Sequence, residues 1–118
     1  MVTFHIDEES ARKLDEAYKV HYIDSKDNVV ALAAAVGLAR DRKKELRNPI
    51  VFRQSFADFD KHNMLSLNAI NKNLNLVSED DVAAEVERYA EGGLELLFSE
   101  DMAGEKLDYF KVYRKYCG

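Results

Sequence analysis

The sequence predicts a mainly α, single-domain protein with one short strand at its N-terminus. A chain of 118 residues has the length of one domain and at this size buries roughly two thirds of its unfolded surface. One proline and five glycines leave few of the residues that turn a chain between strands, which favours helices. A content of 47% hydrophobic and 33% charged residues is typical of a globular protein. We therefore expect residues 1–118 to form a single compact helical domain.

The N-terminus is predicted to be a short strand followed by an amphipathic helix. Residues 2–6 alternate between apolar and polar, which is the period of a half-buried strand. A strand of this length is stable only if it is paired. Asp7 can cap a helix, Glu8 and Glu9 suit its first turn, and apolar residues then recur at helical spacing to about Val20.

The next predicted element is a buried helix. Residues 21–26 interrupt the helical pattern, and a helix capped by Asp24, Ser25 or Asp27 follows. Its apolar residues cover most of its circumference, which indicates burial. Gly37 costs up to about 1 kcal/mol relative to alanine inside a helix, so it either ends the helix or permits close approach of a neighbour. We expect the helix to end near residues 38–41.

The middle of the chain carries weaker signals. Pro49 disfavours a helix at the residue before it, and Ile50 to Phe52 are apolar and β-like. Ser55 can cap a brief helical turn over residues 56–59. A helix is then expected from about Met64 to Asn73, where leucines and an isoleucine recur at helical spacing.

The C-terminal third is predicted to hold two helices with a short apolar segment between them. Ser78 can cap the first, and Gly92 and Gly93 are expected to end it, with one of them in the left-handed conformation. Residues 94–98 are predicted to form one or two helical turns. Residues 102–104 (Met102, Ala103 and Gly104) separate these turns from the final helix.

Charge is segregated along the chain, although the net charge is only −5. Residues 40–47 contain five bases and two acids, a local charge of +3, and bases clustered at a helix end can neutralise several phosphates at once. The alternative is that these cations only stabilise the helix C-terminus. The predicted DNA-binding residues are Arg40, Arg42, Lys43, Lys44 and Arg47.

The second charged segment is acidic. Residues 79–101 contain nine acids and one base, a local charge of −8. Such a run on an amphipathic helix is typical of a solvated face, which is available to a partner protein. The predicted partner-binding residues on this face are Glu85, Glu87 and Glu91.

No set of residues has the spacing of a catalytic or metal site. His5, His21 and His62 share no metal-ligand spacing with one another or with Cys117. Residues 58–62 bring acid, base and imidazole together, but the flanking strand and second carboxylate that a nuclease site requires are missing. We therefore predict a protein that is not an enzyme and has no cofactor, no metal ligands and no catalytic residues.

The sequence also predicts a cytoplasmic protein that does not enter a membrane. No apolar run approaches the roughly 18 to 20 residues that cross a bilayer, and the acidic N-terminus is unlike a signal peptide. The only cysteine is Cys117, which indicates a reducing compartment without disulfides. A lone strand and a modest core would leave edges to cover, so we also expect a homo-oligomer.

The opening MVTFHIDEESARKLDEAY resembles that of ribbon-helix-helix regulators, in which paired N-terminal strands of a dimer lie in the major groove. The outward residues Thr3, His5 and Asp7 supply no lysine or arginine for base contacts, and roughly 70 residues lie beyond the part such a module needs. A ribbon-helix-helix-like dimeric transcriptional regulator is therefore an alternative function, and an oligomeric scaffold without DNA contact is another.

Two stretches together resemble a family. KDNVVALAAAVGLARDRKKEL, an Ala-rich helix with a glycine and a basic exit, and VERYAEGGLELL, with its Tyr-Ala and Gly-Gly-Leu pattern, are similar to motifs of the small accessory proteins of DNA-phosphorothioation (Dnd) systems. Pro49 to Phe52 form a weaker link, and the resemblance covers about half the chain. It implies a cytosolic helical protein of this modification or phage-defence machinery, which acts with double-stranded DNA or other defence-system proteins rather than as a catalyst.

Overall fold

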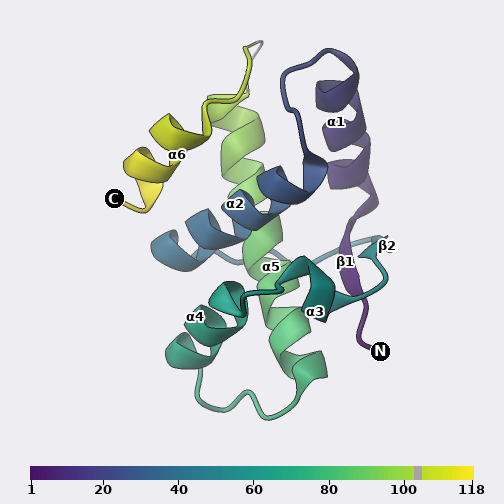
Figure 1. Ribbon diagram of the computed structural model, residues 1–118, viewed down its shortest axis with the longest axis vertical. Coiled ribbons are helices and arrows are strands. Elements are labelled where there is room, and N and C mark those ends of the chain that lie inside the picture. Colours follow the sequence, from purple (N-terminus) through teal and green to yellow (C-terminus); the bar gives the residue numbers. More distant parts are fainter. Residues whose placement is uncertain (103–104) are drawn as a thin grey trace.

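The computed structural model describes residues 1–102 and 105–118, and the prediction made for Ala103 and Gly104 lies outside this part of the chain. The prediction of a mainly α fold with an N-terminal strand is confirmed (Figure 1). In chain order the elements are β1 (Phe4–Asp7), α1 (Glu8–Lys19), α2 (Lys26–Arg40), β2 (Pro49–Arg53), α3 (Phe56–Phe59), α4 (Met64–Lys72), α5 (Glu79–Leu96), the π-helical turn η1 (Leu97–Asp101) and α6 (Tyr109–Tyr116).

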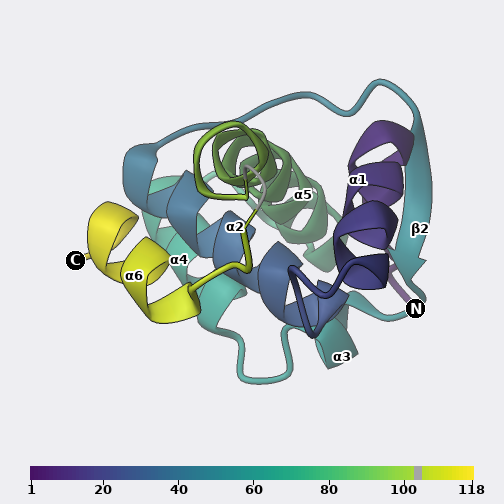
Figure 2. The ribbon, with the colours of Figure 1, turned by 90° about the horizontal axis from the view of Figure 1, so that it is seen from above.

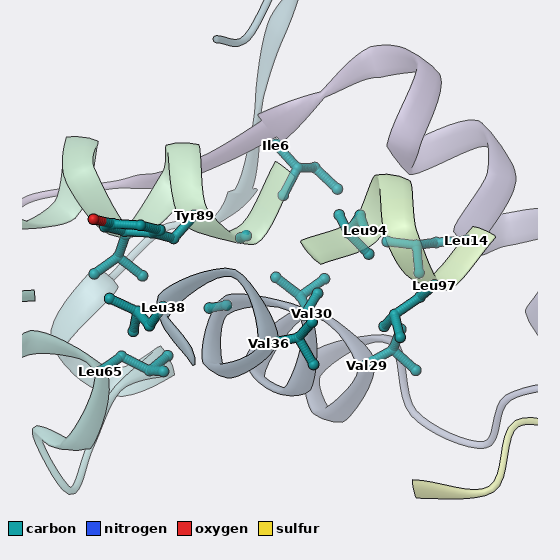
Figure 3. Close-up of a cluster of buried hydrophobic side chains, with 14 of the residues drawn as sticks. Ile6, Leu14, Val29, Val30, Val36, Leu38, Leu65, Tyr89, Leu94 and Leu97 are labelled. Atoms are coloured by element: carbon teal, nitrogen blue, oxygen red, sulfur yellow. The ribbon is translucent and has the colours of Figure 1, made fainter. Parts of the chain in front are cut away.

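Helices α2 and α5 cross at the centre of the molecule. The sheet and α1 lie on one side of this pair, and α4 and α6 lie on the other (Figures 1 and 2). Val30 and Val36 of α2 and Leu94 of α5 are fully buried in this core (Figure 3). Ile6 of β1 and Leu14 of α1 extend the same core. The predicted burial of the second helix is therefore confirmed.

Strand β1 pairs antiparallel with β2, so the predicted strand and the apolar stretch after Pro49 are two halves of one sheet. His5 lies opposite Val51 and Ile6 opposite Ile50 in the register. In a ribbon-helix-helix protein the strand of a second protomer occupies this position beside the N-terminal strand. Here β2 of the same chain occupies it, so the resemblance to that fold ends after the order of the first elements.

Two helix starts follow the predicted serine caps, whereas Asp7 stands at the N-cap of α1 without a side-chain cap hydrogen bond. The Ser25 Oγ accepts a hydrogen bond from the Asn28 N–H at 3.2 Å, and the Ser78 Oγ accepts one from the Asp81 N–H at 3.1 Å. Helix α2 ends as expected, with Asp41 in the left-handed conformation (φ 52°) and the Arg42 N–H donating to the Gly37 carbonyl at 2.8 Å. Local side-chain chemistry therefore sets these boundaries.

The prediction that Gly92 and Gly93 end their helix is wrong, because α5 continues through both to Leu96. Backbones approach so closely here that no side chain fits. A Cβ on Gly93 would lie 1.8 Å from the Ala33 carbonyl oxygen, and one on Gly92 would lie 2.2 Å from the Arg42 carbonyl oxygen. A Cβ on Gly37 would meet the Tyr89 carbonyl oxygen at 2.1 Å, so this glycine also permits close approach rather than ending α2.

Candidate functional site

The basic segment that follows α2, residues 42–47, lies along α5 rather than extending into solvent. The Lys44 N–H donates to the Arg88 carbonyl at 3.0 Å, which fixes the backbone of the segment to the helix. The Arg42 Nη2 lies 2.8 Å from the Glu95 Oε1, and the Lys44 Nζ lies 2.9 Å from the Glu95 Oε2. One carboxylate therefore pairs with two of the predicted DNA-binding cations.

The other three predicted DNA-binding residues have different surroundings. The Lys43 Nζ lies 3.5 Å from the Glu85 Oε1. The Arg40 guanidinium stacks over the Tyr116 ring and donates to the Lys115 carbonyl. The Arg47 side chain is exposed and makes no ion pair within the described part of the chain. Of the five, only the side chains of Arg40 and Arg47 thus have no carboxylate partner among residues 1–102 and 105–118, although the Arg47 N–H donates to the Asp7 Oδ2 at 3.2 Å.

The prediction that Glu85, Glu87 and Glu91 lie on a solvated face is wrong for two of them. Glu85 is 2% exposed and Glu91 is 3% exposed, and both are bonded within the chain. The reason is that α5 is covered on several sides, so its acids serve as internal acceptors. Binding of a partner protein by these residues stays a prediction, although the carboxylates of Glu85 and Glu91 are buried and already bonded within the chain.

Glu87 and Glu91 cover the edge of β1 that faces away from β2. The Glu87 Oε2 accepts from the His5 N–H at 2.6 Å and lies 2.8 Å from the His5 Nδ1. The Glu91 Oε1 accepts from the Asp7 N–H at 2.7 Å, and its Oε2 accepts from the Ser10 hydroxyl at 2.7 Å.

The spacing explains why a helix can replace a third strand here. Two residues of a strand advance by roughly 6.6 Å and four residues of a helix by roughly 6 Å, so carboxylates four apart match N–H groups two apart. Both edges of β1 are therefore occupied within the chain. The open edge that led us to expect self-association through this strand does not exist.

Opposing effects act on the pKa of the two buried glutamates. Burial disfavours the ionised form of Glu85, but hydrogen bonds from Arg88 and Asn73 outweigh it and hold its pKa below the ordinary value. Burial raises the pKa of Glu91, and the bonds from Asp7 and Ser10 offset this only in part. At Glu95 the hydrogen bonds from Arg42 and Lys44 lower the pKa.

Asp60, which sequence reasoning grouped with a weak nuclease pattern, is a buried helix cap. Its carboxylate accepts from the Leu65 and Ser66 N–H groups at 3.1 and 2.8 Å and from the Ser66 hydroxyl at 2.6 Å. These bonds satisfy the first turn of α4. The motif therefore has a structural role. Among residues 1–102 and 105–118, no group of three or more His, Cys, Asp or Glu is placed to hold a metal ion.

A groove of about 420 Å³ lies between α2, α4 and α6, and no sequence pattern predicted it. We call it the α4–α6 groove. Its lining residues are Ala35, Leu38, Ala39, Asn68, Asn71, Lys72, Tyr113 and Cys117. The three helices are far apart in the sequence, so only their packing brings these residues together.

The structure is that of a mainly α protein built on one close crossing of α2 and α5. The basic segment after α2 is joined to α5 by ion pairs. No family model, no curated protein and no solved structure matches the chain. Within the described residues, no helix is both long enough and apolar enough to span a bilayer.

Proposed function

We propose that this protein is a non-enzymatic accessory component of a DNA phosphorothioation-linked modification or phage-defence system, which acts in the cytoplasm through contact with partner proteins or DNA. One observation supports the proposal most. The two stretches that resemble the family meet at a single crossing of α2 and α5, where Gly37, Gly92 and Gly93 let backbones touch. Two motifs of one family are expected to contact each other in the folded protein, whereas two chance matches need not lie together.

The buried carboxylates support an accessory role because each is engaged in holding the chain together. Glu91 accepts from Asp7 and Ser10, and Asp60 caps α4. Glu85 accepts from Arg88 and Asn73. A general base needs a carboxylate oxygen within reach of the substrate proton, and these oxygens are already bonded.

Contact with DNA would begin at Arg40 and Arg47, whose charges no carboxylate compensates among the described residues. The phosphates of the DNA must then displace the Glu95 carboxylate to reach Arg42 and Lys44. Binding through this segment would depend steeply on salt, because each phosphate contact releases a counterion.

Replacing Glu95 with glutamine is therefore expected to tighten binding to duplex DNA, since it frees Arg42 and Lys44 for phosphates. Two added phosphate contacts should steepen the plot of log K against log salt by up to about 2. Fluorescence anisotropy titrations at low and moderate salt measure both quantities.

The control for Glu95→Gln is Asp58→Asn, which makes the same charge change at an exposed position of α3. Asp58 belongs neither to the basic segment nor to α5. Equal tightening by both variants would indicate a general charge effect. A lack of binding at low salt, or binding that survives reversal of Arg42, Lys43, Lys44 and Arg47 to glutamate, would exclude DNA contact through this segment.

The setting in a defence system has a separate test. In a host that carries phosphorothioation genes, deleting the gene for this protein is expected to lower the phosphorothioate content of the genome or the resistance to phage, and the wild-type gene should restore it. Mass spectrometry of digested DNA and plaque counts measure the two effects. Unchanged values in both assays would overturn the proposal.

An oligomeric scaffold is the second candidate function. Exposed apolar residues on α4 and α6 favour it, because large apolar side chains gathered on one side of a small protein mark a contact surface. A ribbon-helix-helix-like regulator is disfavoured, since both edges of β1 are occupied within the chain.

A further inference from the structure

We propose that the α4–α6 groove is the site where a second copy of this chain docks, and that the occupant is the segment of residues 74–81 of that copy. The α2 residues that line the groove are Ala35, Leu38 and Ala39. Helices α4 and α6 form its walls, and the C-terminal half of α2 lies between them (Figures 1 and 2). Two of these three residues are alanines, whose small side chains let another chain approach α2 closely.

Apolar side chains flank the groove on both walls. On α6, Phe110 is 71% exposed and Tyr113 is 52% exposed, and their spacing of three residues places them on one side of the helix. On α4, Met64 and Leu67 are exposed on the flank that also carries Asn68 and Asn71.

Exposed apolar side chains are ordinary when they are single. Here four gather beside one groove, which is the pattern of a contact surface rather than of scattered residues.

The rim of the groove is basic. Lys72 lines one wall, and its only carboxylate neighbour within the described residues is Asp41 at 3.9 Å. Arg114 follows Phe110 by one turn of α6, and its guanidinium lies over the Phe110 ring at 5.7 Å, beside the groove. The surface therefore fits a segment that has apolar side chains followed by acids.

The chain itself contains such a segment. Leu74 and Val77 are 79% and 86% exposed, more than any other large apolar residue of the described chain except Met1. Glu79, Asp80 and Asp81 follow after Ser78 and are also exposed. The segment, LNLVSEDD, thus pairs two unburied apolar side chains with three acids.

The position of the segment allows a reciprocal interface, in which each copy contributes both a groove and a segment. The α4 wall of the groove ends at Lys72, two residues before Leu74, so groove and segment share one edge of the molecule. A two-fold axis at this edge would place each segment in the groove of the other copy, which is the closed arrangement of an isologous dimer.

The test is a charge exchange between two variants. The groove variant carries Lys72→Glu and Arg114→Glu, and the segment variant carries Glu79→Lys and Asp80→Lys. Each alone opposes like charges and is expected to raise the dimer dissociation constant about tenfold or more. In an equimolar mixture both contacts of a mixed dimer are complementary, so association should return. Sedimentation velocity over a range of concentrations measures this.

A variant with Arg12→Glu and Lys19→Glu is the control, because it reverses two charges on α1, on the other side of the central helix pair (Figure 1). It should associate as the wild type does. A wild-type mass that stays at one chain at every concentration would overturn the proposal. So would two charge variants that each associate like the wild type, or a mixture that fails to recover.

A second measurement needs no variant. Cys117 lines the groove and is the only cysteine of the chain, so a dimer should shield its thiol. Alkylation of Cys117 in the wild type is expected to slow as the protein concentration rises. A rate independent of concentration, in a sample that sedimentation shows to be dimeric, would place the interface elsewhere. This proposal does not depend on DNA binding or on the defence setting, because purified protein alone tests it.

Discussion

Replacing Gly93 with alanine is expected to lower the free energy of unfolding by about 3 kcal/mol, the upper end for overpacking a core. The added Cβ would lie 1.8 Å from the Ala33 carbonyl oxygen, and a backbone atom cannot move aside as a flexible side chain can. Helices α2 and α5 would have to separate. Thermal unfolding followed by circular dichroism should show a Tm about 10 °C lower.

Whether Gly93→Ala is less or more stable than the wild type distinguishes the effect of packing from that of helix propensity. Glycine inside a helix costs up to about 1 kcal/mol relative to alanine, so propensity alone predicts that Gly93→Ala stabilises the protein. The matched control is Ala84→Gly, the opposite exchange at a half-exposed position of the same helix, which should cost about 1 kcal/mol. A Gly93→Ala variant that is as stable as the wild type would show that the two backbones are not in contact.

Replacing Glu91 with alanine is expected to cost about 3 kcal/mol, because it leaves the buried Asp7 N–H and the Ser10 hydroxyl without their acceptor. Glutamine at the same position can accept from Asp7 with its oxygen and donate to Ser10 with its amide. Glu91→Gln should therefore cost only about 1 kcal/mol. Urea unfolding of the two variants measures the difference, and equal losses would mean that the hydrogen bonds contribute little.

The stability difference between the wild type and Glu91→Gln is expected to depend on pH, and the sign of this dependence follows from the Glu91 pKa. Burial raises the pKa of Glu91 in the folded state, so the folded protein holds this proton more tightly than the unfolded chain does. Wild-type stability relative to Glu91→Gln should be greatest below the unfolded pKa, near 4.3, and should fall as pH rises through the folded pKa.

The comparison isolates Glu91 because both proteins share Glu85 and Glu95. Those two carboxyls have lowered pKa values, so their contributions run the opposite way and weaken as pH falls. A difference between wild type and Glu91→Gln that grows with pH would contradict the assignment.

Local signals were sufficient where one residue decides the conformation. Ser78 was predicted as a cap and Ser25 as one of three candidate caps, and each accepts the N–H three residues later. The alternation over residues 2–6 and the apolar stretch after Pro49 predicted two extended segments. In each case the cause lies within a few residues of its effect, so the sequence carries it directly.

Prediction failed where the meaning of a residue depends on a distant neighbour. Gly92 and Gly93 have the sequence signature of a helix end, but α2 lies against them, and the close contact makes them part of a continuous helix. Glu85 and Glu91 have the spacing of an exposed acidic face, but the chain covers them on both sides. No local pattern reports which other segment will pack there.

By itself, the sequence determined that this protein is mainly helical, where most helices begin, and that its charge is divided between a basic and an acidic segment. Only the tertiary structure decided that the two segments form ion pairs with each other, with Glu95 between Arg42 and Lys44. It also decided that β1 has no free edge and that the α4–α6 groove exists. The physical reason is that caps and periodicity act within a turn or two, whereas ion pairs, strand edges and grooves form between segments tens of residues apart.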